Sequence, residues 1–340
     1  QLYFLGNPKM AKTSDTNLTY TQEPSFEQAI KSVIAQQWQQ REEGYFKTSQ
    51  KKRLFWCKLT NPSHKKSILV VNGRIESCWK YQELFFDLYQ QGFNVYSYDH
   101  QGQGLSDRLV NDSDIGHIGE FGDYVSDMAQ MVSFFQLSEA ESCYLLAHSM
   151  GGTIATRYLQ THPDHPFKKA ALSAPMYGVN VAWHLQLVAP LLSQILTAFY
   201  PKPTYAPGQQ AYYAKPFEDN PLSQSLVRYE WFRKLYEDNP KLKVGGASTQ
   251  WVWQGLMAAK QCILLTRQIT VPLLLLQASQ DRIVSNQAQV RFIKKLSKTN
   301  PHCEFKAING SQHELLFEQD QYRNQSLDAI CQFLLKEEKN

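Results

Sequence analysis

Two hydrophobic patterns alternate along the chain. Short, almost wholly apolar runs are typical of strands buried on both faces of a parallel sheet, whereas apolar residues repeated every three or four positions are typical of helices. The predicted strands are Arg53–Leu59, Ser67–Val71, Phe93–Tyr98, Cys143–His148, Ala170–Pro175, Val271–Ala278 and Cys303–Ile308. The predicted helices are Ser77–Gln91, Phe121–Phe135, Gly152–Gln160, Gln287–Leu296 and Gln321–Leu335. This alternation predicts an α/β fold, with a mostly parallel sheet and helices on both faces.

One long segment interrupts the alternation. Residues 179–268 are rich in aromatic side chains and are too long for a simple crossover between two strands. We therefore expect an inserted, mostly helical cap here, between the two parts of an α/β core at 51–178 and 269–340. Residues 1–50 are expected to form a basic, helical extension. Because ligands of open α/β sheets bind at the carboxyl ends of the strands, such a cap would cover the site.

The charge is modest overall but uneven. The net charge is +4, which excludes a strongly basic nucleic-acid binder. Residues 1–66, however, hold eleven Lys and Arg against five Asp and Glu. This excess indicates either a solvated surface or attraction to anionic lipid headgroups. The six cysteines have no metal-site spacing and are interpreted as free thiols of a cytosolic-facing protein. The apolar stretch 181–200 is broken by polar residues and does not predict a membrane span.

The segment CYLLAHSMGG carries the strongest chemical signal. A buried strand ends at His148, Ser149 follows, and a glycine-rich turn leads at once into a helix. This strand–turn–helix context predicts a nucleophile elbow that exposes the Ser149 hydroxyl. Ala147 stands where the general pattern has glycine, which the elbow tolerates if this residue keeps an extended backbone.

A serine hydroxyl needs a base and an acid to become a good nucleophile. In the chain order expected after an elbow, Asp281 follows one late strand and His313 follows the next. We therefore predict the catalytic residues Ser149, Asp281 and His313. Asp320 and Glu314 are rivals for the acid, and His148 is a rival for the base, although a histidine beside the nucleophile is expected to point away from it.

Acyl transfer also needs donors for the oxyanion of the tetrahedral intermediate. The backbone N–H of Met150, directly after the nucleophile, is one candidate. The second is the backbone N–H of Arg74, in the loop after an early strand. Two roles remain open for the Arg74 side chain: a salt bridge with Glu76, or a contact with a headgroup phosphate.

Several motifs together resemble the α/β-hydrolases of the monoacylglycerol-lipase branch, and within it the bacterial lysophospholipases. They run nearly end to end: GRIES at 73–77, DHQGQGLSDR at 99–108, AHSMGG at 147–152, APMYG at 174–178, VGGAST at 244–249 with Trp251 beyond it, LLLLQASQD at 273–281 and HELLFE at 313–318. Gln101 and Asn72 depart from the usual pattern, which has Arg and His at these positions.

The resemblance implies a serine hydrolase that cleaves the carboxyl ester of lipids with one acyl chain, through an acyl-serine at Ser149. Lysophospholipids are the first expectation for the substrate, and Arg74 and Trp251 are expected to contact it. Monoacylglycerol lipase or general carboxylesterase activity is the alternative; a proline-iminopeptidase-type peptidase and a non-catalytic protein of the same fold are less favoured. No cofactor, metal, nucleic acid or obligate protein partner is expected, and the enzyme is expected to be cytoplasmic, with peripheral contact at the inner face of the membrane.

Overall fold

A single eight-stranded sheet organises the molecule. The computed structural model describes residues 19–180 and 203–336, so residues 1–18 of the predicted extension and 181–202 of the predicted cap lie outside it. The strands are β1 (Glu42–Lys47), β2 (Arg53–Leu59), β3 (Lys66–Val71), β4 (Phe93–Tyr98), β5 (Ser142–His148), β6 (Phe167–Ser173), β7 (Leu273–Ala278) and β8 (Cys303–Ile308). Their order in the sheet is β1-β2-β4-β3-β5-β6-β7-β8. The strands from β4 to β8 in this order pair in parallel, whereas the pairs β1–β2 and β2–β4 are antiparallel. Among the described strands, β2 therefore runs against the others.

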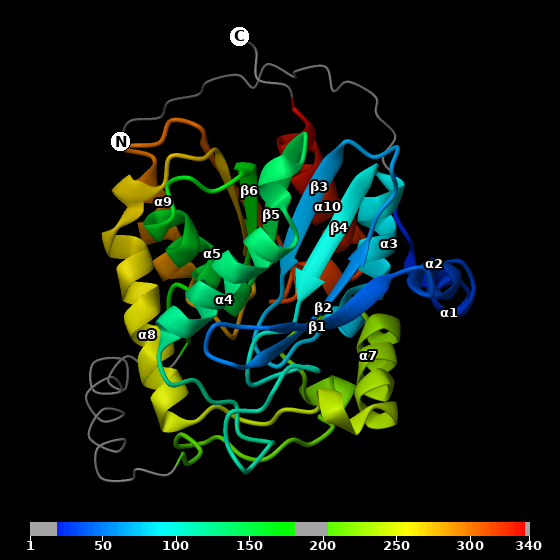
Figure 1. Ribbon diagram of the computed structural model, residues 1–340. Coiled ribbons are helices and arrows are strands. Elements are labelled where there is room, and N and C mark those ends of the chain that lie inside the picture. The colour runs from blue at the N-terminus through cyan, green and yellow to red at the C-terminus, as the bar shows by residue number, and fades with distance from the viewer. Residues whose placement is uncertain (1–18, 181–202, 337–340) are drawn as a thin grey trace, which may run out of the picture.

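Helices cover both faces of this sheet (Figure 1). They are α1 (Glu23–Lys31), α2 (Val33–Trp38), α3 (Gln82–Gln90), α4 (Phe121–Phe134), α5 (Met150–Thr161), α7 (Leu226–Asp238), α8 (Thr249–Leu264), α9 (Asn286–Leu296) and α10 (Asp320–Leu335). Helices α4, α5, α8 and α9 contribute to the apolar core on one face. Helices α3 and α10 contribute to the core on the other. Because successive strand side chains point to opposite faces, Leu145 enters the first core and Leu146 the second.

The hydrophobic pattern located these elements well. The predicted bounds of the strands now called β2, β4 and β8 are confirmed to the residue, and the other predicted elements lie within a few residues of their expected ends. Two differences are informative. The helix expected from Ser77 starts as a 3₁₀ turn, Cys78–Tyr81, before α3 begins. Within the extension expected to be helical, residues 42–47 form β1, which pairs along its whole length with β2 at the edge of the sheet.

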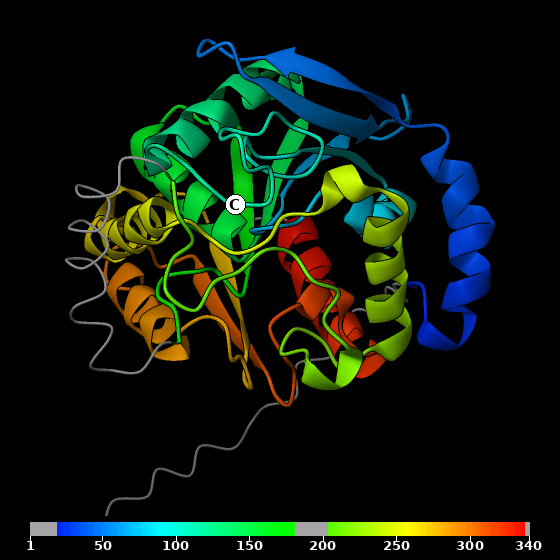
Figure 2. The same ribbon diagram turned by 90° about the horizontal axis from the view of Figure 1, so that it is seen from below.

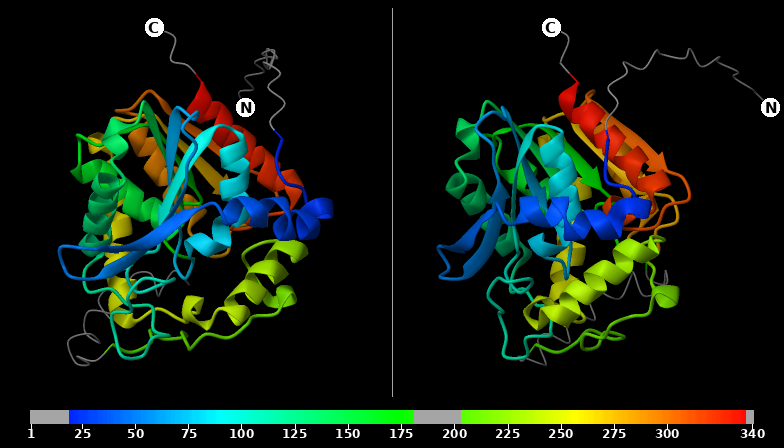
Figure 3. Two further views of the ribbon diagram at one scale, coloured as in Figure 1. Left: turned by 45° about the vertical axis from the view of Figure 1, so that its right-hand side comes forward. Right: turned by 90° about the vertical axis from the view of Figure 1, so that its right-hand side faces the viewer.

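The described part of the segment 179–268 lies across the carboxyl ends of the parallel strands (Figures 1 and 2). Helices α7 and α8 stand on opposite sides, and extended chain runs between them beneath the sheet. Helix α7 also packs on the N-terminal helix α1, where Phe26 and Trp231 meet edge to face with ring centroids 5.9 Å apart (Figure 3). None of the described helices is long and apolar enough to cross a lipid bilayer. All six cysteines are free.

Candidate active site

Ser149 occupies a sharp turn between β5 and α5. Its backbone has φ 52° and ψ −119°, a left-handed conformation that is strained for a residue with a side chain. The turn needs glycine on its inner side, because a Cβ on Gly151 would lie 2.3 Å from the carbonyl oxygen of Val71 and one on Gly152 would lie 2.7 Å from Pro175. Ala147 remains in the extended strand and needs no positive φ. The sequence therefore forms the elbow that was predicted.

The three predicted catalytic side chains meet at this turn. His313 Nε2 lies 2.9 Å from the Ser149 hydroxyl oxygen, and His313 Nδ1 lies 2.7 Å from Asp281 Oδ2. The other carboxylate oxygen of Asp281 accepts hydrogen bonds from the backbone N–H groups of Ile283 (2.7 Å) and Val284 (2.9 Å), which fix its orientation. All three side chains are buried. In this arrangement the carboxylate holds Nδ1 protonated and leaves Nε2 free to accept the serine proton.

The electrostatic surroundings favour a basic imidazole. Burial by itself opposes the charged form of His313, but the facing carboxylate of Asp281 outweighs it, so the pKa of His313 is raised above its ordinary value. His148 behaves in the opposite way, because burial lowers its pKa to about 4. His313 is thus the histidine suited to take up a proton near neutral pH.

The rivals considered for the triad are engaged elsewhere. Asp320 pairs with Arg228, and Glu314 pairs with Lys80. The expectation that His148 points away from the site is wrong, since its ring lies 5.0 Å from the His313 ring and it lines the same cavity. Its Nδ1 is 3.1 Å from the carbonyl oxygen of Ser173, to which it donates. A neutral His148 therefore packs beside the triad rather than joining it.

The loop Asn72–Glu76 passes directly over the nucleophile. A Cβ on Gly73 would lie 3.3 Å from Ser149 Cβ and 2.9 Å from Glu76 Oε2, so only glycine allows this approach. The backbone N–H groups of Arg74 and Met150 make no hydrogen bond to any described residue. Free N–H groups beside a nucleophile are what a developing oxyanion needs.

The Arg74 side chain does not form the salt bridge with Glu76 that was considered for it. Glu76 instead pairs with Lys80 at 2.8 Å. The Arg74 guanidinium lies 5.3 Å from the centre of the Trp251 ring and donates to the carbonyl oxygen of Gly245 (3.2 Å). It makes no ion pair with a described carboxylate, and burial lowers its pKa to about 10. A cation in this position lacks a counter-ion of its own.

The two departures from the family pattern support the loops around the site. Asn72 donates to the carbonyl oxygen of Tyr98 (3.2 Å). Gln101 donates to the buried carboxyl of Asp127 (2.7 Å), whose pKa is raised to about 7 by burial. An amide thus holds this loop where an arginine would form an ion pair.

The site opens into a cavity of about 690 Å³ between the sheet and the described part of 179–268. Among the described residues of its walls, five carry cationic side chains, Arg74, Lys80, Lys215, Arg233 and Arg282, and two carry carboxylates, Glu76 and Glu314. Apolar atoms provide most of the remaining wall, including those of Met176, Val179 and Leu256. Within the described ranges, no group of three or more His, Cys, Asp or Glu side chains is arranged to hold a metal ion.

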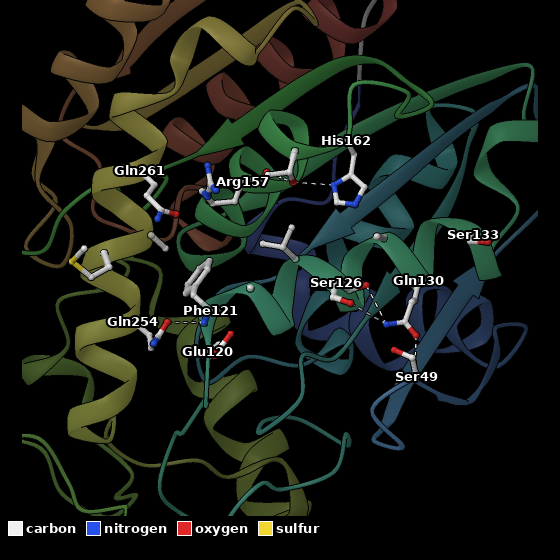
Figure 4. Close-up of a pocket in the computed structure, with 16 residues that line it drawn as sticks. Ser49, Glu120, Phe121, Ser126, Gln130, Ser133, Arg157, His162, Gln254 and Gln261 are labelled. Atoms are coloured by element: carbon white, nitrogen blue, oxygen red, sulfur yellow. Dashed lines mark hydrogen bonds between the residues drawn. The ribbon is translucent and has the colours of Figure 1, made fainter. Parts of the chain in front are cut away.

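A second cavity, of about 760 Å³, lies between α4, α5 and α8 (Figure 4). Phe121, Arg157 and His162 line it, and it shares no residue with the cavity at Ser149. The two cavities take up different faces of α8: Gln254 and Gln261 border the second one, whereas Trp251 and Gly255 border the first. Volume alone therefore does not distinguish them, but only the first contains the nucleophile, the base and the free N–H groups.

Comparison with known proteins gives the family. Residues 62–320 match the family model described as serine aminopeptidase, S33. The chain belongs to this family. It is 34% identical to lysophospholipase L2 of Escherichia coli, over 92% of this chain and 93% of that protein. It is 27% identical to the monoglyceride lipase of Rattus norvegicus, over 81% and 84% of the two chains.

Solved structures agree on the architecture. A soluble variant of monoglyceride lipase from Saccharomyces cerevisiae superimposes with a TM-score of 0.67 at 16% identity, covering 87% of this chain and 96% of that one. A monoacylglycerol lipase from Paleococcus ferrophilus gives 0.65 at 19% identity, with 83% and 98% covered. The predicted α/β-hydrolase fold and the predicted membership of the lipase branch are both confirmed.

Proposed function

We propose that this protein hydrolyses the carboxyl ester of lipids with a single acyl chain, and that lysophospholipids are its substrates. The observation that carries the proposal is the hydrogen-bonded series Ser149–His313–Asp281, with separations of 2.9 and 2.7 Å, at the floor of a largely apolar cavity. The relatives named lysophospholipase and monoglyceride lipase support an ester-hydrolase function for the chain.

The chemistry follows from this geometry. Ser149 Oγ attacks the ester carbonyl carbon while His313 Nε2 takes the serine proton, and Asp281 stabilises the imidazolium. The backbone N–H groups of Arg74 and Met150 donate to the oxyanion. His313 then returns its proton to the leaving glycerophosphate alcohol, and the acyl-serine remains. Water, deprotonated by His313, hydrolyses that ester and releases the fatty acid.

The acyl chain would lie against the apolar walls that the core and the described part of residues 179–268 build together. Each CH₂ group removed from water contributes about 0.8 kcal/mol. Because this gain grows with chain length, the cavity favours long single-chain lipids over short esters. A second acyl chain would compete for the same apolar walls.

The charge of the cavity supports a phosphate-bearing substrate. Arg74 pairs with none of the described carboxylates, and its guanidinium beside Trp251 could bind a phosphodiester with two parallel N–H groups. Arg233 and Lys215 reinforce the positive charge of the same cavity. An aminopeptidase would instead need a free carboxylate for the substrate's α-amino group. The two carboxylates of the described cavity wall both bind Lys80, which argues against that activity.

A panel of single-chain substrates tests this function. Purified protein would be assayed with lysophospholipids, monoacylglycerols of the same acyl length and amino-acid p-nitroanilides, with Ser149→Ala as the blank. We expect the lysophospholipid to be the best substrate. Arg74→Gln should lower kcat/KM for the lysophospholipid about 10- to 100-fold, because it removes a hydrogen bond between charged groups. The kcat/KM for the uncharged monoacylglycerol should change less than about threefold. Equal losses on both lipids would remove the headgroup role of Arg74, and exclusive cleavage of the anilides would overturn the proposal.

Membrane contact is proposed as a peripheral, electrostatic association with the anionic inner face of the cytoplasmic membrane. Lys51 and Lys52 lie at the turn between β1 and β2, and neither forms an ion pair with a described carboxylate. Each basic residue near an anionic surface contributes about 1 kcal/mol. Co-sedimentation with anionic vesicles that high salt and the pair Lys51→Glu, Lys52→Glu both weaken would support it. Binding that does not depend on lipid charge or salt concentration, or no binding at all, would contradict it.

A further inference from the structure

A buried lysine lies between the two loops that the proposed chemistry uses. Lys80 belongs to the 3₁₀ turn before α3 and is 2% exposed. Its Nζ lies 2.8 Å from Glu76 Oε1 and 2.6 Å from Glu314 Oε1. Two aromatic rings enclose the ammonium, with centroids at 4.3 Å for Phe232 and 4.4 Å for Phe317. An enclosed ammonium that holds two carboxylates fixes the separation of the elements that carry them.

The first carboxylate controls the loop over the nucleophile. Glu76 Oε2 accepts hydrogen bonds from the backbone N–H of Gly73 (2.5 Å) and from the Tyr81 hydroxyl (2.6 Å). Ile75, which lies between Gly73 and Glu76 in the chain, has φ 59°, and this conformation is strained for a β-branched residue. Strain of this kind persists only where surrounding bonds impose it. Glu76, held in turn by Lys80, shares this task with Gln103, whose Oε1 accepts a hydrogen bond from the Ile75 N–H (3.1 Å). Together they set the place of the Arg74 backbone N–H.

The second carboxylate belongs to the residue next to the general base. Glu314 follows His313, and its backbone N–H donates to the carbonyl oxygen of Leu222, in the segment before α7 (2.8 Å). Glu314 is 4% exposed, and its Oε2 has no hydrogen-bond partner among the described residues. The ammonium of Lys80 is therefore the main compensation for this buried negative charge.

We propose that Lys80 is a positioning residue, which holds the Gly73–Glu76 loop and the His313 loop at their working separation and offsets the negative charge of Glu76 and Glu314 beside the imidazole. This inference rests on the proposed function of Ser149 and His313.

The electrostatic part has a definite sign. Glu76 and Glu314 both favour the protonated imidazole and contribute to the raised pKa of His313, after the larger effects of burial and of Asp281. A general base works only in its neutral form, so a higher pKa moves the acid limb of the activity profile to higher pH. Among the described residues, Asp281, Glu76, Glu314 and His148 act on His313, and Lys80, Tyr81 and Tyr236 act on the carboxylates of Glu76 and Glu314.

Glu314→Gln is the decisive variant. It removes one negative charge beside His313, retains a side chain that can bind Lys80, and retains the backbone bond to Leu222. We expect the acid limb of kcat/KM for a short p-nitrophenyl ester to move to lower pH by about half a unit to one unit. The labelling rate of Ser149 with a fluorophosphonate should follow the same pH shift. An unchanged acid limb would overturn the electrostatic part.

Lys80→Met tests the positional part. We expect kcat to fall about 10- to 100-fold while KM changes less than threefold. An oxyanion donor stabilises the transition state and not the bound substrate, so its displacement lowers kcat. Adding Glu314→Gln should recover part of the loss, since it removes the uncompensated carboxylate.

Lys169→Met is the matched control. Lys169 is also a buried lysine, but it donates to the carbonyl oxygens of Phe333 and Lys336 at the end of α10, away from the site. It should lower the unfolding temperature without moving the acid limb. If Lys80→Met and Lys169→Met both change only the unfolding temperature, Lys80 is merely structural. Should Lys80→Met not fold, Glu314→Gln still decides. A wild-type protein that neither hydrolyses esters nor labels would overturn the proposed function itself, whereas an active wild type whose variants titrate unchanged would overturn only the role of Lys80.

Discussion

Two buried ionic clusters, each with members at or just before α3, have different consequences. The first is the cluster of Lys80 with Glu76 and Glu314. The second joins Glu83 and Asp87 of α3 to Arg228 of α7 and Arg323 of α10. Arg228 binds Glu83 at 2.9 Å and Asp320 at 2.9 Å, and Arg323 binds Asp87 at 2.6 Å.

The difference follows from the two kinds of cation. The planar guanidinium groups of the second cluster spread their donors over several partners, including the carbonyl oxygens of Glu318 and Leu316. They stay charged at any pH at which the protein folds, so this cluster ties α7 to the core as long as its carboxylates are ionised. The single ammonium of Lys80 leaves Glu314 Oε2 without a donor, next to a histidine that must change its charge. The cluster of Arg228 and Arg323, the arginine cluster, is therefore suited to holding helices together. The cluster of Lys80, the lysine cluster, is suited to shifting the pKa of a titrating group.

The largest expected effect separates chemistry from stability. Ser149→Ala should reduce ester hydrolysis by about 10⁶-fold, because the acyl-enzyme can no longer form. The urea midpoint should not fall, since the substitution removes a hydroxyl from a strained position and breaks neither ionic cluster. Steady-state kinetics and urea unfolding on the same preparation measure both. Residual turnover above about 1% of the wild-type rate would mean that another nucleophile acts.

The next effect compares the two aspartates that were rivals for the triad. Asp281→Asn should lower kcat by about 10⁴-fold, because an amide at this place favours the wrong tautomer of His313. Asp320→Asn serves as the control, because Asp320 binds Arg228 rather than a histidine. Comparable losses of kcat in the two folded variants would contradict the assignment of Asp281.

Arg228→Met should lower the free energy of unfolding by about 3 to 5 kcal/mol, because Glu83 is then left buried with less compensation. Lys234→Met, on the same helix, removes only the exposed pair with Asp238 and should leave the urea midpoint unchanged. The fraction of folded Arg228→Met should hydrolyse a short ester at a near-normal rate. A loss of turnover in fully folded protein would assign this cluster a part in the chemistry.

The smallest expected effect on stability concerns Asp320, the partly exposed member of the arginine cluster. Asp320 has a side chain that is 20% exposed, and Arg228 keeps Glu83 when it is neutralised. Asp320→Asn should therefore cost about 1 kcal/mol of unfolding free energy, measured by urea titration. A cost as large as that of Arg228→Met would show that the cluster fails as a whole when any member loses its charge.

The sequence by itself determined the elements and the three residues of the candidate triad. Buried strands read as apolar runs, and a parallel sheet gathers the residues that follow its strands at one edge. Ser149, Asp281 and His313 each follow such a strand, so their meeting could be predicted without coordinates. Edge strand β1 was missed because its residues 42–47, EEGYFK, show neither an apolar run nor an alternation of apolar and polar side chains, and only pairing with β2 makes them a strand.

Tertiary structure alone decided how the charges are paired. From sequence, Glu76 was the natural partner of Arg74, two positions away, yet it binds Lys80 in the next turn. Lys80 also meets Glu314, which is 234 positions further along the chain. Local spacing constrains the partners of a charge only within one helix or strand. For side chains that leave loops, the packing of the surrounding elements decides which charges lose water together, and buried charges must then pair with whatever that packing brings close.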